Sequence, residues 1–148
     1  MNIISWNVRG LGRPAKRFLV RDFLLLHCAK VCCLQESKLE ELPNAIWRDV
    51  GGHKLDNFTI LRTRGSVGGI VVGWNSSFLI GKVLFTGSFC LTVEFCCKRD
   101  NLWWLCTSVY GPKAHSLKLA LWEEIRSGCE RGPSLGYLWR FQRYLLSQ

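Results

Sequence analysis

Apolar and polar positions follow a strand, helix and strand pattern over the first 35 residues. The apolar-leaning run 2–6 leads into a loop that contains two glycines and Pro14. Between residues 15 and 28, Leu19, Phe23 and Leu26 recur at helical spacing, and proline suits the first turn of a helix. The run 30–35 has the length and the buried residue types of a central strand. A right-handed β-α-β crossover would make the two strands parallel, with their carboxyl ends at one edge of a sheet.

Beyond this unit the pattern changes to short strands separated by turn residues. A short helix is expected over 40–50, before a pair of glycines. Strand-like runs follow at 58–62, 69–74, 78–85, 90–97 and 102–110. Such consecutive runs favour antiparallel hairpins. Helices are expected at 115–127 and 135–146. Trp103 and Trp104 could form a stacking platform, but neighbours on a strand face opposite ways, so at least one ring is expected in the core.

Composition is that of an ordinary globular domain with a basic surface. The chain has 148 residues, 48% of them hydrophobic and 21% charged, and a formal net charge of +9. This excludes a mainly disordered chain and indicates contact with a polyanion. No apolar run reaches the roughly 18 residues of a membrane span, and no secretory signal is evident, so we expect an intracellular protein, nuclear or cytoplasmic, that does not bind membranes.

The eight cysteines do not have the spacing of a metal site. Cys32–Cys33 and Cys96–Cys97 are adjacent pairs, and no Cys-x-x-Cys occurs. A secreted disulfide scaffold is possible, but abundant aromatic and aliphatic residues are present to build a core without one. Reduced cysteines that act as small buried hydrophobes are the favoured interpretation.

A cluster of four basic residues lies near the N-terminus, before the first acidic residue, Asp22. This cluster consists of Arg9, Arg13, Lys16 and Arg17. Such a cluster can contact nucleic-acid phosphates, or it can be the solvated face of a helix.

Polar side chains stand where three of the expected strands end. Asn7 closes the first strand and Glu36 follows the second, while Tyr110 ends a long strand before Gly111–Pro112. Ligands of open α/β sheets bind beyond the carboxyl ends of parallel strands. A carboxylate there suits Mg²⁺, which commonly combines one or two protein carboxylates with water and phosphate. The alternative for Glu36 is a solvated strand end.

Four segments in this order resemble the endonuclease/exonuclease/phosphatase (DNase I-like) superfamily. They are Ser-Trp-Asn-Val-Arg-Gly-Leu from residue 5, Leu-Gln-Glu-Ser-Lys from 34, Gly-Gly-Ile-Val-Val from 68 and Val-Tyr-Gly-Pro from 109. The sequence around Asn7 and the Leu-Trp-Glu-Glu segment from 121 look most like the endonuclease domain of plant LINE-type, non-LTR retrotransposons. The resemblance covers residues 1–133 and leaves 134–148 as a divergent tail.

The resemblance implies an α/β (α+β) fold, a DNase I-like four-layer sandwich of two sheets with helices outside, incomplete at its C-terminal side. It also implies a phosphodiesterase that acts on DNA with Mg²⁺ or Mn²⁺ and needs no small-molecule cofactor. By the same resemblance, Glu36 binds the metal, Asn7 supports the metal and phosphate, and Tyr110 contacts phosphate.

The sequence also departs from the superfamily. The later Gly-Asp-Phe-Asn and Ser-Asp-His segments, whose side chains position the attacking water and complete the site, do not occur. We therefore expect a truncated or frameshifted copy of a retroelement endonuclease that is inactive alone. The alternatives are a non-catalytic nucleic-acid-binding remnant, or another branch of the superfamily that acts on phospholipids or nucleotides.

Overall fold

The structure, a computed structural model, describes residues 1–64 and 68–130. The expected helix at 135–146 and the tail 134–148 lie outside the described residues. In chain order the elements are β1 (Asn2–Asn7), α1 (Pro14–Leu26), β2 (Ala29–Gln35), α2 (Asn44–Gly51), β3 (Asn57–Leu61), β4 (Ile70–Trp74), β5 (Leu79–Thr86), β6 (Cys90–Cys97), β7 (Trp103–Val109), a short 3₁₀ turn (His115–Leu117) and α3 (Lys118–Glu130).

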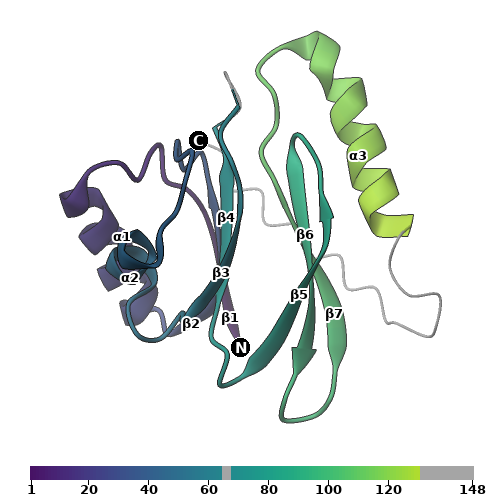
Figure 1. Cartoon of the computed structure of the whole chain (residues 1–148). Coiled ribbons are helices and arrows are strands. Elements are labelled where there is room, and N and C mark those ends of the chain that lie inside the picture. Colours follow the sequence, from purple (N-terminus) through teal and green to yellow (C-terminus); the bar gives the residue numbers. More distant parts are fainter. Residues whose placement is uncertain (65–67, 131–148) are drawn as a thin grey trace.

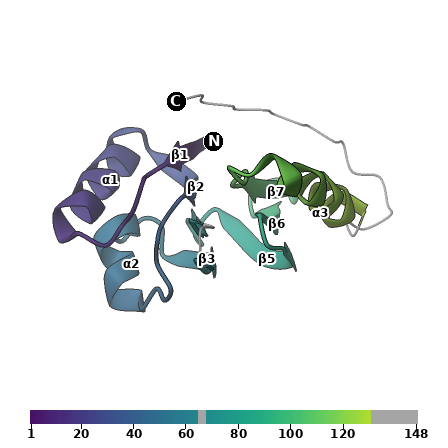
Figure 2. The ribbon, with the colours of Figure 1, turned by 90° about the horizontal axis from the view of Figure 1, so that it is seen from above.

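The strands form two sheets that pack face to face between helices. One sheet has the order β1-β2-β4-β3 and the other β5-β6-β7. Helices α1 and α2 lie outside the first sheet, and α3 lies outside the second (Figures 1 and 2). The expected layered α/β fold is therefore confirmed.

Alternating residues of the central strands build two separate apolar cores. On β2, Cys32 and Leu34 pack against the helices, whereas Val31 and Cys33 face the second sheet. This alternation is the ordinary period of a strand. Because both faces are covered, β2 and β4 are buried along most of their length, as the apolar runs of the sequence predicted.

The N-terminal unit forms as expected, with β1 and β2 parallel and Asn7 opposite Gln35. The expected hairpins also form, since β3–β4, β5–β6 and β6–β7 are antiparallel. Strands β4 and β5, by contrast, do not pair but belong to different sheets. In the turn between them the Asp56 carboxylate accepts the Ser76 backbone N–H at 2.8 Å.

Helix α2 begins later than expected. The sequence placed its start at residue 40, whereas the helix begins at Asn44, after Pro43. The preceding segment packs on the first core through Leu39 and Leu42, and the Leu39 carbonyl accepts the Thr63 N–H. These tertiary contacts, together with the proline, keep residues 40–43 out of the helix. Within the described residues, no helix is both long enough and apolar enough to span a membrane.

Candidate functional site

Glu36 lies in a strained backbone conformation at the carboxyl end of β2. Its φ angle is +57°, a region that few non-glycine residues adopt. Backbone hydrogen bonds hold it there. The Glu36 carbonyl accepts the Gly10 N–H at 2.7 Å, and the Ser37 carbonyl accepts the Leu11 N–H at 2.9 Å. Arg9 and Lys38 in the same two loops also have positive φ, at 53° and 55°. Clustered strain of this kind is common at functional sites.

The glycine pair before β4 makes this conformation possible. A Cβ atom on Gly68 would lie 2.8 Å from Glu36 Cγ and 3.0 Å from Glu36 Cα, closer than such atoms pack. The Lys38 N–H donates to the Gly68 carbonyl at 2.7 Å, so the two backbones are directly joined. Gly68 is thus a positioning residue for Glu36, which the sequence signalled only as a glycine pair before a buried strand.

Asn7 lies beside this loop at the end of β1. Its Oδ1 accepts the Arg9 backbone N–H at 3.1 Å and shapes the turn into the loop before α1. The side chain is exposed. Asn7 and Glu36 therefore occupy neighbouring positions at the same sheet edge.

Tyr110 reaches the same edge from the second sheet. Its backbone N–H donates to the Phe89 carbonyl at 2.9 Å, and its side chain packs on the core between the sheets. Burial raises the pKa of the Tyr110 phenol, and the negative charge of Glu36 raises it further. The phenol is therefore protonated at neutral pH and available as a hydrogen-bond donor near the carboxylate.

Gln35 ties the strand ends together and was not expected from the sequence. Its Nε2 donates to Ser5 Oγ on β1 at 3.0 Å and to Ser108 Oγ on β7 at 3.1 Å. One side chain thus joins the strands that carry Asn7, Glu36 and Tyr110. The structure brings these three residues to one edge, where the two sheets meet.

The charge of Glu36 is partly compensated. Lys38 Nζ lies 3.4 Å from Glu36 Oε1, and the lysine side chain is 58% exposed whereas that of Glu36 is 18% exposed. An exposed ammonium makes a weak and replaceable partner. Beside Gly69, the buried hydroxyls of Ser37 and Thr63 have no hydrogen-bond partner among the described residues.

The oxygen donors at this edge fit a hard divalent cation held by one carboxylate. Glu36 supplies the carboxylate, and Asn7 and Tyr110 supply neutral oxygens. Mg²⁺ retains several waters and binds through one or two carboxylates together with substrate phosphate. Over residues 1–64 and 68–130, no three His, Cys, Asp or Glu side chains gather as a set of metal ligands. The site thus fits a water-rich ion and not a closed protein cage.

The basic residues near the N-terminus divide into two kinds. Arg9 and Arg13 are exposed, and Lys16 is half-buried with its Nζ 5.5 Å from the centre of the Trp6 ring. Arg17 does not fit the expected DNA-contacting role, because it is only 8% exposed. Its Nε binds Asp49 Oδ2 at 3.0 Å, and its Nη1 donates to the Leu11 and Gly12 carbonyls. The Arg17 guanidinium fastens α1 to α2.

The three histidines lie at the end of α1, after α2 and in the 3₁₀ turn that follows Tyr110. His27 ends α1 and packs on Phe23, with 4.3 Å between ring centres. His53 and His115 are exposed, the first in the turn after α2 and the second at the 3₁₀ turn.

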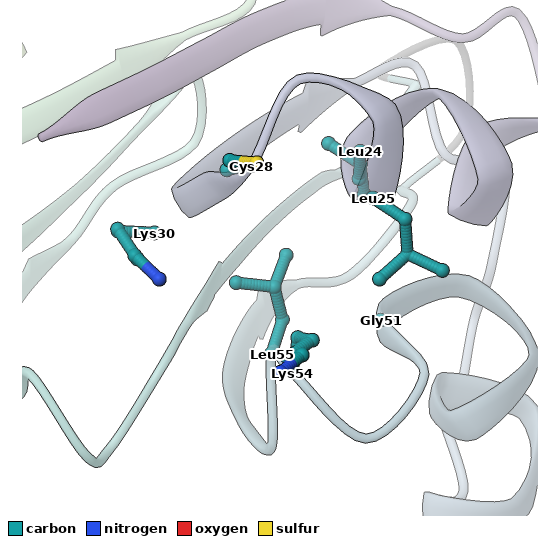
Figure 3. Close-up of a pocket in the computed structure, with 8 residues that line it drawn as sticks. Leu24, Leu25, Cys28, Lys30, Gly51, Lys54 and Leu55 are labelled. Atoms are coloured by element: carbon teal, nitrogen blue, oxygen red, sulfur yellow. The ribbon is translucent and has the colours of Figure 1, made fainter.

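A pocket of about 150 Å³ lies between α1 and α2 at the opposite end of β2 (Figure 3). It is lined by Leu24, Leu25, Cys28, Ala29, Lys30, Gly51, Lys54 and Leu55. This lining has two lysines and no carboxylate, and it adjoins the amino end of β2, whereas Glu36 follows the carboxyl end. The pocket is therefore separate from the candidate site.

Comparisons with known proteins identify the fold. No family model matches the sequence, and a comparison with curated proteins finds no match. Among solved structures, AP endonuclease LMAP from Leishmania major superposes with a TM-score of 0.59 at 19% identity, over 87% of this chain and 47% of that protein. A humanized D. rerio TDP2 with 14 mutations gives a TM-score of 0.52 at 16% identity, over 87% of this chain and 58% of that protein.

Identities this low establish a common fold and nothing about activity. The chain spans about half the length of the solved structures that it matches. It has the DNase I-like α/β fold and covers part of it.

Proposed function

We propose that this chain is part of a retrotransposon-derived endonuclease domain that binds a divalent metal and DNA at the Glu36 edge but does not hydrolyse DNA alone. The observation that carries the proposal is the joining of Asn7, Glu36 and Tyr110 at one edge, around a glutamate held at positive φ by the Gly68 backbone. The fold shared with an AP endonuclease supports it. A DNA substrate implies action inside the cell.

Each residue has a role that its chemistry suits. Glu36 would hold Mg²⁺ or Mn²⁺, with water and a DNA phosphate completing the coordination. When bound, such an ion offsets the negative charge of the phosphate and of the leaving oxygen. The Asn7 amide and the protonated Tyr110 phenol orient the phosphate as neutral donors.

The lack of hydrolysis follows from the groups around Glu36. Hydrolysis needs a positioned water and a group that accepts its proton, and one such group is commonly worth about 10²–10⁴ in rate. Tyr110 is protonated, Lys38 Nζ lies 3.4 Å from Glu36 Oε1, and His27 follows α1 near the amino end of β2. None of these three side chains is therefore suited to act as the base beside Glu36.

The metal site is tested by titrating the protein with Mn²⁺ and following free Mn²⁺ by electron paramagnetic resonance. We expect one site that Glu36→Gln abolishes. Glu40→Gln is the matched control, because Glu40 is an exposed glutamate in the following loop. Equal binding by the parent protein and Glu36→Gln would refute the assignment.

Catalysis is tested separately by nicking of supercoiled plasmid with Mg²⁺ or Mn²⁺. We expect no nicking by the parent protein or by Glu36→Ala. Nicking by the pure protein that disappears in Glu36→Ala would contradict the proposed inactivity.

A second candidate is a non-catalytic nucleic-acid-binding module. The observation that favours it is the exposure of Arg9 and Arg13 on the loop beside Glu36. Such a module would bind DNA with strong salt dependence, and at constant ionic strength neither Mg²⁺ nor Glu36 would be needed for its binding. DNA binding that Mg²⁺ strengthens and that Glu36→Gln weakens would favour the first candidate.

A further inference from the structure

Two cysteines from different sheets lie in contact directly behind the candidate site. Cys33 on β2 and Cys106 on β7 have their sulfur atoms 3.5 Å apart, although 73 positions separate them in the sequence. Both side chains belong to the core between the sheets. Each lies two positions before a member of the Gln35–Ser108 hydrogen bond. The thiol pair therefore lies next to the Gln35–Ser108 hydrogen bond, one inter-sheet contact further from the strand ends.

We propose that Cys33 and Cys106 form a reversible disulfide that joins the two sheets when the protein meets a hydroperoxide. A disulfide needs the sulfur atoms to approach from 3.5 Å to about 2.05 Å. That approach requires side-chain rotation on two strands that are already in contact. Neither Cys33 nor Cys106 is part of a disulfide in the structure.

The environment of the two thiols differs in a way that sets the order of events. Cys33 is almost fully buried, and Cys106 on the other sheet is the less buried residue of the two. The hydrogen bond between the two sulfur atoms lowers the pKa of Cys106, and the same bond together with burial raises the pKa of Cys33. Since the thiolate is the nucleophile, Cys106 reacts first.

The chemistry balances with hydrogen peroxide as the oxidant. The Cys106 thiolate attacks one peroxide oxygen, the O–O bond breaks, and the leaving hydroxide takes a proton to become water, which leaves a sulfenic acid. Cys33 then loses its proton and attacks the Cys106 sulfur, and the sulfenic oxygen leaves as a second water. Overall, two thiols lose two electrons and two protons while one peroxide becomes two waters.

The bond would have a large effect on stability because it closes a long loop. A cross-link across more than 70 residues removes much of the freedom of the unfolded chain. For a domain of this size we expect the melting temperature to rise by about 10 °C on oxidation and to return on treatment with dithiothreitol.

The test uses the full chain treated with hydrogen peroxide, then blocked with a thiol-alkylating reagent and digested for mass spectrometry. We expect one linked peptide pair that contains Cys33 and Cys106, together with the rise in melting temperature. Cys106→Ser should lose both. Cys28→Ser is the matched control and should keep both, because Cys28 is an exposed thiol outside the pair.

Three outcomes would overturn the proposal. They are a linked pair that involves other cysteines, sulfinic acid at Cys106 without a link, and a linked pair that leaves the melting temperature unchanged. If Cys106→Ser does not fold, the linked peptide and the reversible melting shift of the unaltered protein still decide the question. None of these measurements depends on metal or DNA binding, so failure here is distinct from failure of the proposed function.

Discussion

The two sheets are covered by their helices in different ways. Trp47 and Val50 of α2 and Val20 of α1 are at most 2% exposed and pack on apolar residues of β2 and β4. On the second sheet, the corresponding face of β6 carries Thr92 and Glu94. Helix α3 is anchored there by the Glu124 carboxylate, which accepts the N–H groups of Ser88 and Phe89. Its Leu119 and Trp122 remain 75% and 57% exposed.

This contrast shows where the stability of the described fold is concentrated. Apolar burial is the dominant favourable term in folding, and an exposed anchor of a few hydrogen bonds contributes far less. Elements with few buried apolar contacts open locally at lower cost. Glu36 and Asn7 are built on the sheet with apolar helix packing, whereas Tyr110 comes from the sheet whose central strand carries Thr92 and Glu94 on its outer face. The predictions below test this difference.

The largest expected effect is on the free energy of unfolding when α2 loses its tryptophan. Trp47 is 2% exposed, donates to the Leu55 carbonyl at 2.6 Å and contacts the Phe58 ring. Trp47→Ala should destabilise the protein by about 3–5 kcal/mol, measured by urea unfolding. Trp122→Ala on α3 is the matched control and should change stability by about 0.5 kcal/mol or less. Similar losses for the two variants would remove the contrast between the helices.

A smaller loss of stability is expected when the buried arginine is removed. Arg17→Met leaves Asp49 and the Leu11 and Gly12 carbonyls without this donor, so we expect a loss of about 1–3 kcal/mol. Arg13→Met, a change of an exposed arginine four positions earlier, should cost about 0.5 kcal/mol or less. Urea unfolding measures both. An Arg17→Met variant as stable as the parent would return Arg17 to the set of candidate DNA contacts.

The sequence predicted the local elements well because their signals are local. Periodicity placed β1, α1 and β2 within about two residues, and the parallel crossover followed from handedness. Periodicity could not show that the chain changes sheets after β4, because the turn residues there are also typical of a hairpin. That change depends on contacts between distant segments, such as the hydrogen bond from Ser76 to Asp56.

The sequence indicated the candidate site residues but not the contacts that hold them in place. Asn7, Glu36 and Tyr110 were recognisable as polar residues at strand ends. The Gln35 bridge and the Gly68 contact with Glu36 join segments at least 30 positions apart, so no local pattern indicates them. The expected DNA-contacting role of Arg17 was wrong for another reason. The sequence alone does not reveal whether a basic residue on a helix faces solvent or a buried partner.

DNA affinity should depend on the basic residues near the candidate site and not on those near the second sheet. Replacing Arg9, Arg13 and Lys16 with glutamine should weaken DNA binding about tenfold at low salt and reduce the slope of log affinity against log salt by up to about 3. Replacing Lys82 of β5 together with Lys98 and Arg99 of the turn after β6 removes the same charge and should change little. Fluorescence anisotropy with a labelled duplex measures both. If the two sets of replacements weakened DNA binding equally, the affinity would depend only on the net charge of the protein.

The smallest expected effect is on the pH dependence of stability, and it tests whether the two sheets meet at the candidate site. Burial and the Glu36 charge raise the pKa of Tyr110 above its usual value near 10. The unfolded chain therefore releases the phenolic proton at lower pH than the folded protein does. Stability should then fall as pH rises from about 10 through the folded pKa.

Tyr110→Phe should remove that part of the alkaline loss. Glu36→Gln should remove only the part due to its charge, because burial remains. Urea unfolding between about pH 9 and 11 with a metal chelator, using Glu41→Gln as the charge control, measures the differences. If Glu36→Gln followed the same pH profile as the parent while Tyr110→Phe did not, the carboxylate and the phenol would not be neighbours. The three strand ends would then not form a single site.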